Sequence, residues 1–549
     1  MCIRDSSDPG QVPGDHERHE ARPDGQLHDE EDDERAHALI VDGRRARRPG
    51  PGLPWAVMRT SHRDQLSALD ASFLAQEDET AHMHMGAVLT FAGPAPPYDA
   101  LLEHVRGRLH LTPRYRQKLA FPPYGLGRPF WVDDPFFNLA YHVREAALPA
   151  PGSIEQLRTL AGRIFSERLD RSKPLWEAWL VHGLEDDGFA IVSKTHHCLV
   201  DGISGIDLVG ALFDAEPGAR ARPAPDAHWT AKPVPSEAEL AVEGLKGMAR
   251  IPLGLVAHAV RALDRPDRAL GELRDAVEGV GDIAWAALNA APETPLNRPI
   301  GPHRRVHWTL ASLDDVKLIK DTLGGTVNDV LMAVVTGALR RWLPSRGVRP
   351  EGLELFALVP VSVRQADDPS PTGNRLLVLR GALPVYAAGA AERLTLVREA
   401  MDRLKGSKQA LGAEVIQRLQ GLAPTGLLAQ VSRINFTTRL FNLLVTNVPG
   451  PQAPLYLLGH ELRGSFPVAP LAQGHALAVA IMSYNGGVHF GLLADDDALP
   501  DLPDFSAHLD ESLAELLAAA RATRPTLPPA PADPNGRSAG RPAASEAAR

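Results

Sequence analysis

Hydrophobic residues recur along the chain with two spacings, one typical of helices and one typical of strands. Spacings of three and four residues predict helices over 99–109, 391–404 and 501–520. Short continuous or alternating apolar runs predict strands over 189–193, 356–363 and 376–385. Two further runs, 476–483 and 488–493, flank Asn485-Gly486, a dipeptide typical of a tight hairpin turn. This mixture predicts an α/β (α+β) fold.

The pattern weakens at both ends and changes in the middle of the chain. Residues 1–50 contain no Phe, Tyr or Trp and alternate acidic with basic runs, which is typical of a segment without a packed core. We expect a disordered or non-native leader (1–57), an N-terminal domain (58–225), a helical linker (226–300), a C-terminal domain (301–524) and a disordered tail (525–549). The apolar stripe of the linker is typical of core packing, and a membrane-surface helix is the alternative.

Composition narrows the class of protein. The 549 residues carry a formal net charge of −10, which disfavours nucleic acid as a partner because phosphate binding needs a basic surface. The chain has two cysteines, Cys2 and Cys198, so we expect neither a disulfide scaffold nor a cysteine-based zinc site. No apolar run approaches the ~18 residues of a membrane span. We therefore expect a cytoplasmic protein whose contact with a membrane is at most peripheral.

The most informative segment begins with His196-His197 and reaches Asp201-Gly202, directly after the predicted strand 189–193. A neutral imidazole can accept a proton from an alcohol, and its usual pKa of about 6.5 suits a general base. Asp201 can hold the loop through an ion pair with an arginine or cap the helix that follows. Gly202 permits a tight turn. The segment therefore predicts a site at the end of a strand.

Other chemistries fit the same segment less well. Paired histidines can be buried structural residues or metal ligands, although only one carboxylate lies nearby in the sequence. Ser204 lacks the last glycine of a nucleophile elbow. Cys198 directly follows His197 and is expected to point elsewhere. The pair His82-x-His84 is more typical of a strand face than of a metal site, so we expect no bound metal.

The segment from His196 to Gly202 resembles the motif of CoA-dependent acyltransferases with the chloramphenicol acetyltransferase-like fold. The Asp-Phe-Gly-Trp-Gly signature of the plant acyltransferases in that superfamily is absent from the chain. Seven other segments resemble, in order, those of bacterial wax ester synthase/diacylglycerol acyltransferases: Leu66–Phe73, Met83–Gly86, Lys173–Glu177, Val327–Val330, Pro360–Arg364, Gly373-Asn374 and Asn447–Pro451. The resemblance spans residues 65–520.

The resemblance implies two chloramphenicol acetyltransferase-like domains, joined by the helical linker, with a substrate channel between them. It implies that His197 is the general base and that His196 positions it. Asp201, beside Gly202, would form a structural ion pair with Arg364. The alcohol oxygen would attack the acyl thioester directly, without an acyl-enzyme.

Further candidates come from the other matching segments. Asn328 and Asp329 open a predicted helix, so they either cap that helix or shape the channel. The donor that meets the developing oxyanion would be Asn447 or Ser483. Trp176 is either a channel wall or a core residue. The candidates for the substrate channel are Pro174, Leu175, Trp176 and Ser483.

The resemblance also implies substrates and partners. Acyl-CoA would donate a long-chain acyl group to diacylglycerol, to a long-chain alcohol or to both, and no cofactor is expected beyond acyl-CoA as substrate. Because these products are insoluble in water, we expect a protein at the inner membrane face or at lipid inclusions. Two alternatives stay open. One is a condensation-like enzyme that takes acyl groups from a carrier protein, and the other is a scaffold of lipid inclusions, which would not need the histidine motif.

Overall fold

Two mixed sheets organise the part of the chain that the computed structural model describes, namely residues 64–199, 211–218, 229–246, 290–362, 376–406 and 440–523. These residues all belong to one unit, Ala56–Arg549. The expected leader and tail and most of the expected linker lie outside the described residues. Of the linker, residues 237–246 are helical.

The first sheet has the strand order β11-β12-β1-β6-β5-β4. Its strands are β1 (His84–Phe91), β4 (Val143–Ala147), β5 (Trp176–Leu184), β6 (Gly188–His196), β11 (Tyr456–Leu457) and β12 (His460–Val468). β12 comes from the last third of the chain, yet it pairs antiparallel with β1 from Gly86 opposite Val468 onward. No sequence pattern indicated that β12 joins the first sheet, because strand periodicity does not identify the partner strand.

The second sheet has the order β7-β14-β13-β10-β8-β9. Its strands are β7 (Arg304–Ser312), β8 (Leu355–Ser362), β9 (Leu376–Leu383), β10 (Leu443–Pro449), β13 (Leu477–Tyr484) and β14 (Gly487–Asp495). The predicted hairpin is confirmed: Asn485 and Gly486, with φ of 44° and 80°, connect β13 to β14. Positive φ at both positions is what this tight turn requires.

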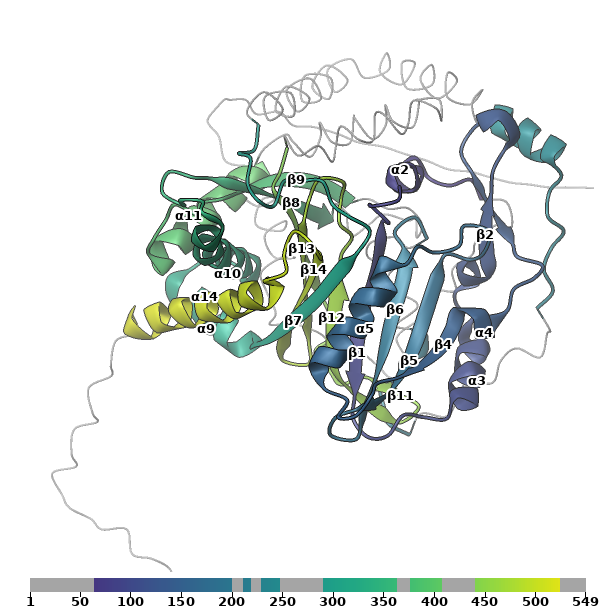
Figure 1. Ribbon diagram of the computed structural model, residues 1–549, viewed down its shortest axis with the longest axis horizontal. Helices are drawn as coiled ribbons and strands as arrows, with labels where there is room; N and C mark the ends of the chain where they lie inside the picture. The colour runs from purple at the N-terminus through teal and green to yellow at the C-terminus, as the bar shows by residue number, and fades with distance from the viewer. Residues whose placement is uncertain are drawn as a thin grey trace, which may run out of the picture. The chain divides into compact units, whose positions relative to one another are not determined.

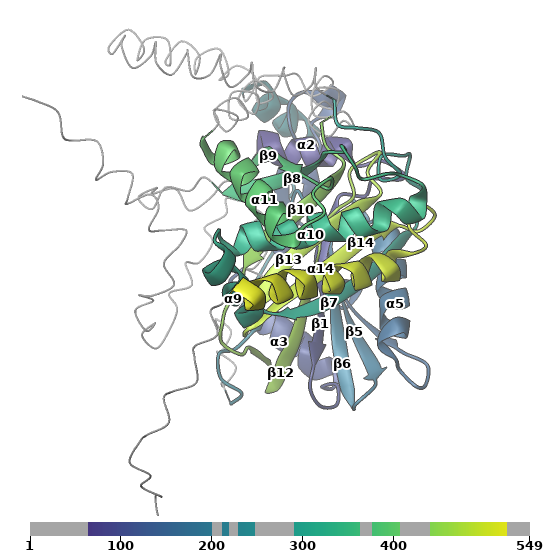
Figure 2. The ribbon, with the colours of Figure 1, turned by 90° about the vertical axis from the view of Figure 1, so that its left-hand side faces the viewer.

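Helices cover the sheets (Figure 1). They are α2 (Ala68–Gln76), α3 (Tyr98–Arg108), α4 (Leu139–His142), α5 (Ile154–Ser166), α9 (Leu313–Leu323), α10 (Val327–Trp342), α11 (Ala390–Gly406) and α14 (Leu502–Thr523). Short 3-10 turns span Pro113–Arg116, Pro123–Gly125 and Leu343–Arg346, and a small hairpin pairs β2 (Gln117–Ala120) with β3 (Phe130–Asp133). Figure 2 shows α10, α11 and α14 lying over one face of the second sheet. The helices predicted over 99–109, 391–404 and 501–520 are confirmed as α3, α11 and α14.

The two sheets are joined by close packing at two places. On α5, Gly162 lies so near β7 that an added Cβ would come within 2.7 Å of the Arg304 carbonyl oxygen. On β14, a Cβ at Gly491 would lie 1.7 Å from the Pro467 carbonyl oxygen of β12. Only glycine permits these approaches, so the close packing depends on a single residue at each place. One apolar core runs through α5, β6, α10 and the second sheet as a result.

Candidate active site

The site lies at the end of β6, between the residues that directly precede β1 and β5. His196 is the last residue of β6 and lies opposite His84 of β1. Its backbone N–H donates to the Leu175 carbonyl, 3.0 Å away, at the start of β5. The next N–H, of His197, donates to the Met83 carbonyl at 2.9 Å. The main chain of both histidines is therefore fixed from either side.

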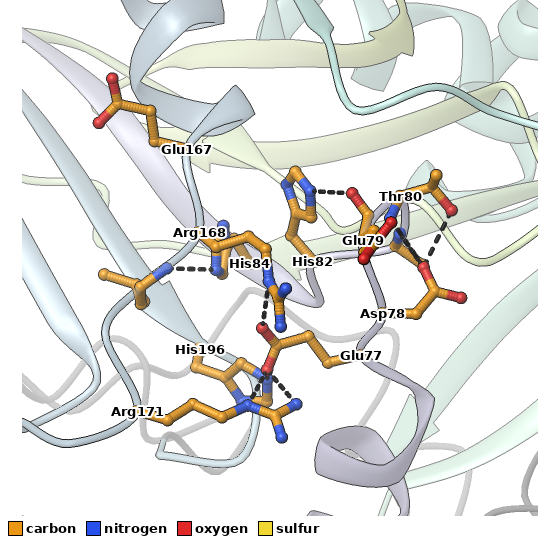
Figure 3. Close-up of polar contacts among 12 residues, drawn as sticks. Glu77, Asp78, Glu79, Thr80, His82, His84, Glu167, Arg168, Arg171 and His196 are labelled. Atoms are coloured by element: carbon orange, nitrogen blue, oxygen red, sulfur yellow. Dashed lines mark hydrogen bonds and ion pairs between the residues drawn. The ribbon is translucent and has the colours of Figure 1, made fainter.

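Helix α2 supplies the other half of the site. Ser67 caps its first turn by accepting the Asp70 N–H at 3.0 Å. Phe73 and Glu77, the residue that ends the helix, are four positions apart, a spacing that places side chains on one helix face. The Phe73 ring stacks on the His197 ring with centroids 3.9 Å apart. Glu77 instead faces the preceding histidine, as Figure 3 shows.

The two nitrogens of His196 face different partners. Nδ1 accepts the backbone N–H of Cys198 at 3.0 Å. Nε2 lies 3.3 Å from Oε2 of Glu77, a contact at ion-pair distance that is less well aligned than a good hydrogen bond. Because Nδ1 accepts, the proton of the neutral ring is on Nε2 and faces the carboxylate. Both side chains are only 1% exposed, and burial lowers the pKa of His196.

Glu77 is the centre of a charged cluster. Arg171 Nε donates to its carboxylate at 2.7 Å, and Arg168 Nε donates to the other oxygen at 3.2 Å. Burial alone would raise the pKa of Glu77, but His196 and Arg171 outweigh it and lower the pKa to about 2. The carboxylate is therefore ionised at neutral pH, although its side chain is sealed from solvent.

His197 lies in different surroundings. Its side chain is half-buried, and its buried Nδ1 has no hydrogen-bond partner among the described residues. Burial lowers the pKa of His197 to about 4, and the neighbouring His196 contributes in the same direction. The imidazole is thus neutral near pH 7 and able to accept a proton, as a general base requires.

The adjacent thiol lacks the properties of a nucleophile. Cys198 is 3% exposed, and burial, followed by the charges of Asp70 and Glu77, raises its pKa well above the usual value. Reactive cysteines have lowered pKa values and partial exposure. Cys198 is instead a structural residue whose N–H holds the His196 ring.

The pair His82 and His84 is bound to main-chain groups. Nε2 of His82 contacts the Glu79 carbonyl at 3.0 Å, and Nε2 of His84 accepts the Leu169 N–H at 3.4 Å. Within the described ranges, no group of three or more His, Cys, Asp or Glu side chains is arranged to hold a metal ion. These histidines therefore support the entry of the chain into β1.

Three predicted motif residues, Asp201, Gly202 and Arg364, lie outside the described residues, as does Ser204. The structure brings Asn328 and Asn447 together: Nδ2 of Asn447 donates to Oδ1 of Asn328 at 3.3 Å.

Asp329 belongs to a capping box at the start of α10. Its carboxylate accepts the N–H and the hydroxyl of Thr326, both at 2.8 Å. Ser483, on β13, accepts the Gly450 N–H with its hydroxyl at 3.4 Å and the Gln452 amide at 3.2 Å. It thereby holds the loop after β10.

The segment Pro174–Trp176 supports β6 from the β5 side. All three residues are buried, and Leu175 holds the His196 N–H, as described above. The indole of Trp176 donates to the Tyr115 carbonyl at 2.8 Å and stacks on His142 with centroids 4.8 Å apart. These are core contacts. The role of the segment in a substrate channel stays a prediction.

Glu77 and Arg171 were missed from the sequence. The only signal for Glu77 is its spacing of four residues from Phe73 within a capped apolar helix. Arg171 lies in a segment between α5 and β5 that has no periodicity. Its contact with Glu77 joins residues 94 positions apart, which no local pattern encodes.

Comparison with known proteins places this site in a family. Residues 66–331 match the wax ester synthase/diacylglycerol acyltransferase catalytic domain, and residues 372–517 match the corresponding C-terminal domain. A Mycobacterium tuberculosis protein named probable diacylglycerol O-acyltransferase tgs1 is 33% identical over 472 residues, which cover 84% of this chain and 98% of that protein. The chain belongs to the wax ester synthase/diacylglycerol acyltransferase family, and it is an acyltransferase.

Solved structures agree with this assignment. A wax ester synthase/diacylglycerol acyltransferase from Marinobacter aquaeolei is similar with a TM-score of 0.58 and 28% identity, over 83% of this chain and all of that one. The first condensation domain of the CDA synthetase has a TM-score of 0.52 at 18% identity, over 83% of this chain and 96% of that domain. The latter similarity concerns the fold alone. The expected chloramphenicol acetyltransferase-like fold is confirmed.

The described helices were also compared with the length of a membrane span. No single one is long and apolar enough to cross a bilayer. Residues Leu313–Leu323 and Val327–Arg346 reach the required length and composition only together, with a bend of 100° between them.

Proposed function

We propose that the protein transfers a long-chain acyl group from acyl-CoA to the hydroxyl group of diacylglycerol, a long-chain alcohol or both, forming triacylglycerol or wax ester. The observation that carries this proposal is the difference between the two histidines. Both nitrogens of His196 face protein groups, whereas His197 is partly exposed, neutral and free of an ion pair in the described residues. His197 is therefore the residue suited to act as general base.

The proton and the electron pairs balance without a covalent enzyme intermediate. The imidazole of His197 takes the hydroxyl proton as the alcohol oxygen attacks the thioester carbonyl carbon. The new C–O bond forms, the C–S bond breaks, and the proton passes from the imidazolium to the departing CoA thiolate. The raised pKa of the buried Cys198 thiol supports direct attack over a thioester on the enzyme.

Two side chains remain candidates for the donor that meets the oxyanion on the former carbonyl. Asn447 already gives its amide to Asn328, and Ser483 is bound to the loop after β10. Both lie near the carboxyl ends of the adjacent parallel strands β10 and β13. Replacing each by alanine should separate them, since loss of an oxyanion donor costs about 10²- to 10³-fold in kcat.

We infer that the protein works at a membrane or lipid-inclusion surface, because both acceptor and product are water-insoluble. No cofactor is needed for this chemistry, so dialysis against EDTA should leave turnover unchanged.

The decisive assay gives the purified chain labelled palmitoyl-CoA with hexadecanol, dioleoylglycerol or neither. Wild type should form a labelled ester only when an alcohol is present, and His197→Ala should not. His508→Ala, which removes a histidine of α14, is the matched control and should behave as wild type. A parallel reaction supplies the labelled acyl group as a carrier-protein thioester instead, and label transferred only from that thioester would refute acyl-CoA as the donor. Label in neither ester would refute the acceptors.

A further inference from the structure

The end of helix α2 contains a buried carboxylate that the reaction itself does not use. Among the described residues, the side-chain contacts of Glu77 do not include His197. It contacts His196, Arg168 and Arg171, and its side chain is 1% exposed. A buried ion pair contributes little to stability after desolvation, so stability alone gives a weak reason for placing a charge there.

We propose that Glu77 is a positioning residue for the acyl transfer: anchored by Arg171, its carboxylate keeps the proton of His196 on Nε2. Nδ1 of His196 then remains free to accept the Cys198 N–H, and this contact fixes the turn that carries His197. The inference rests on the proposed role of His197 as the base.

The structure contains each contact of this relay, which runs from Arg171 through Glu77 and His196 to the Cys198 N–H. The Arg171 Nε lies 2.7 Å from Glu77 Oε2, which lies 3.3 Å from His196 Nε2. On the other side of the ring, Nδ1 lies 3.0 Å from the Cys198 nitrogen. If the proton moved to Nδ1, that ring atom and the Cys198 N–H would both be donors, and the contact would be lost.

The described neighbours of Glu77 and His196 come from several elements. The carboxylate faces His196 from β6 and the two arginines from the segment after α5, while Arg171 also donates to the Leu74 carbonyl of α2 at 3.2 Å. The ring of His84, from β1, meets the His196 ring edge-on at 6.2 Å between centroids. Because α2 also provides Phe73, which stacks on His197, one helix face controls both histidines.

The first test is kinetic. Glu77→Gln keeps the size of the side chain and removes the charge that selects the tautomer. We expect kcat to fall by about 100-fold, the scale of a misplacement of about 1 Å, while KM for both substrates changes little. Glu79→Gln is the matched control, since this residue lies two positions away and is exposed, and it should retain wild-type kcat. Wild-type kcat in Glu77→Gln would overturn the proposal.

The second test separates positioning from charge balance. The double variant Glu77→Met, Arg171→Met replaces the buried carboxylate and its partly exposed arginine partner by apolar side chains of similar length, a kind of exchange that proteins often tolerate. We expect the melting temperature to stay near that of wild type and kcat to remain low by about 100-fold. Recovery of kcat would show that Glu77 only neutralises Arg171, and the proposal would fail.

The third test is independent of turnover, so it distinguishes failure of this inference from failure of the proposed function. Long-range ¹H–¹⁵N correlation spectra of histidine-labelled wild type report which ring nitrogen carries the proton. The His196 signal is assigned by its loss in His196→Gln. We expect the Nε2–H tautomer in wild type and a mixture in Glu77→Gln. A wild-type His196 protonated on Nδ1 would overturn the relay even if the enzyme is active.

Discussion

His196 and His197 are consecutive residues of one type, but the fold gives them opposite surroundings. His196 is sealed among charges, with a carboxylate on one nitrogen and a backbone N–H on the other. His197 packs on the aromatic ring of Phe73 and remains partly exposed. The difference arises where β6 ends, because His196 is the last residue of the strand and His197 begins the turn that follows.

The contrast shows how one motif separates two tasks. A general base must be neutral and accessible to the substrate. On the apolar side of the motif, where Phe73 packs on His197, desolvation disfavours the imidazolium and keeps the ring neutral. A positioning residue must be held in one orientation and one tautomer. On the charged side of the motif, where Glu77 faces His196, fixed partners achieve this. Changes on the two sides should therefore have different consequences for activity and for stability.

The largest effect is expected on the apolar side. His197→Ala removes the base and should lower kcat by about 10²- to 10⁴-fold. The melting temperature should change little, because the buried Nδ1 of this ring has no hydrogen-bond partner in the part of the chain that the structure describes. Ester formation by the purified variant and thermal unfolding measure the two quantities. A variant with wild-type kcat would refute the assignment of the base.

The charged side should respond in stability as well. His196→Ala leaves the Cys198 N–H without its acceptor and removes the imidazole that faces Glu77. We expect the free energy of unfolding to fall by about 1–3 kcal/mol, the cost of an unsatisfied buried group, together with a loss of activity. Urea unfolding of this variant beside His197→Ala would test the contrast, and equal stabilities of the two would contradict it.

The pH profile should reveal the apolar packing of the base. With a pKa of about 4 for His197, kcat/KM should stay level from neutral pH down to about 5 and fall below that. Phe73→Leu admits water to the ring, so the acid limb should move toward about 6.5, the ordinary value. A wild-type limb near that ordinary value would refute the burial of the base.

The same shift has a consequence for stability. The unfolded chain binds a proton at His197 near pH 6.5, whereas the folded chain binds it only near 4. This group therefore costs the folded state no stability above pH 6.5, and it destabilises the folded state increasingly as the pH falls from 6.5 toward 4. Because other buried histidines also have lowered pKa values, the contribution of His197 is measured by difference: the urea midpoint should decline less steeply with falling pH in His197→Ala than in wild type.

The smallest effect is expected at the rim of the charged side. Arg168 contacts the same carboxylate as Arg171, but its side chain is 44% exposed. An exposed ion pair contributes about 0–1 kcal/mol, so Arg168→Gln should leave kcat and the melting temperature close to wild type. A large loss of activity would show that the exposed Arg168 also belongs to the charged cluster that positions His196, and it would contradict the expected small effect.

Much of the secondary structure follows from local pattern. The spacing of apolar residues predicted α3, α11 and α14, and Asn485-Gly486 predicted the hairpin of β13 and β14. These features depend on residues close together in sequence. The pairing of β12 with β1 could not be predicted in this way, because it joins strands more than 360 residues apart.

The site likewise has features that depend on adjacent residues and features that depend on residues far apart in the sequence. The sequence by itself determined the histidine motif, the family and the type of chemistry, since these depend on the identity of adjacent residues. The tertiary structure alone decided which histidine is neutral and reachable and which is fixed, because Phe73, Glu77 and Arg171 reach the motif from separate segments. Protonation and orientation are set by burial and by neighbouring charges, and both exist only after the chain has folded.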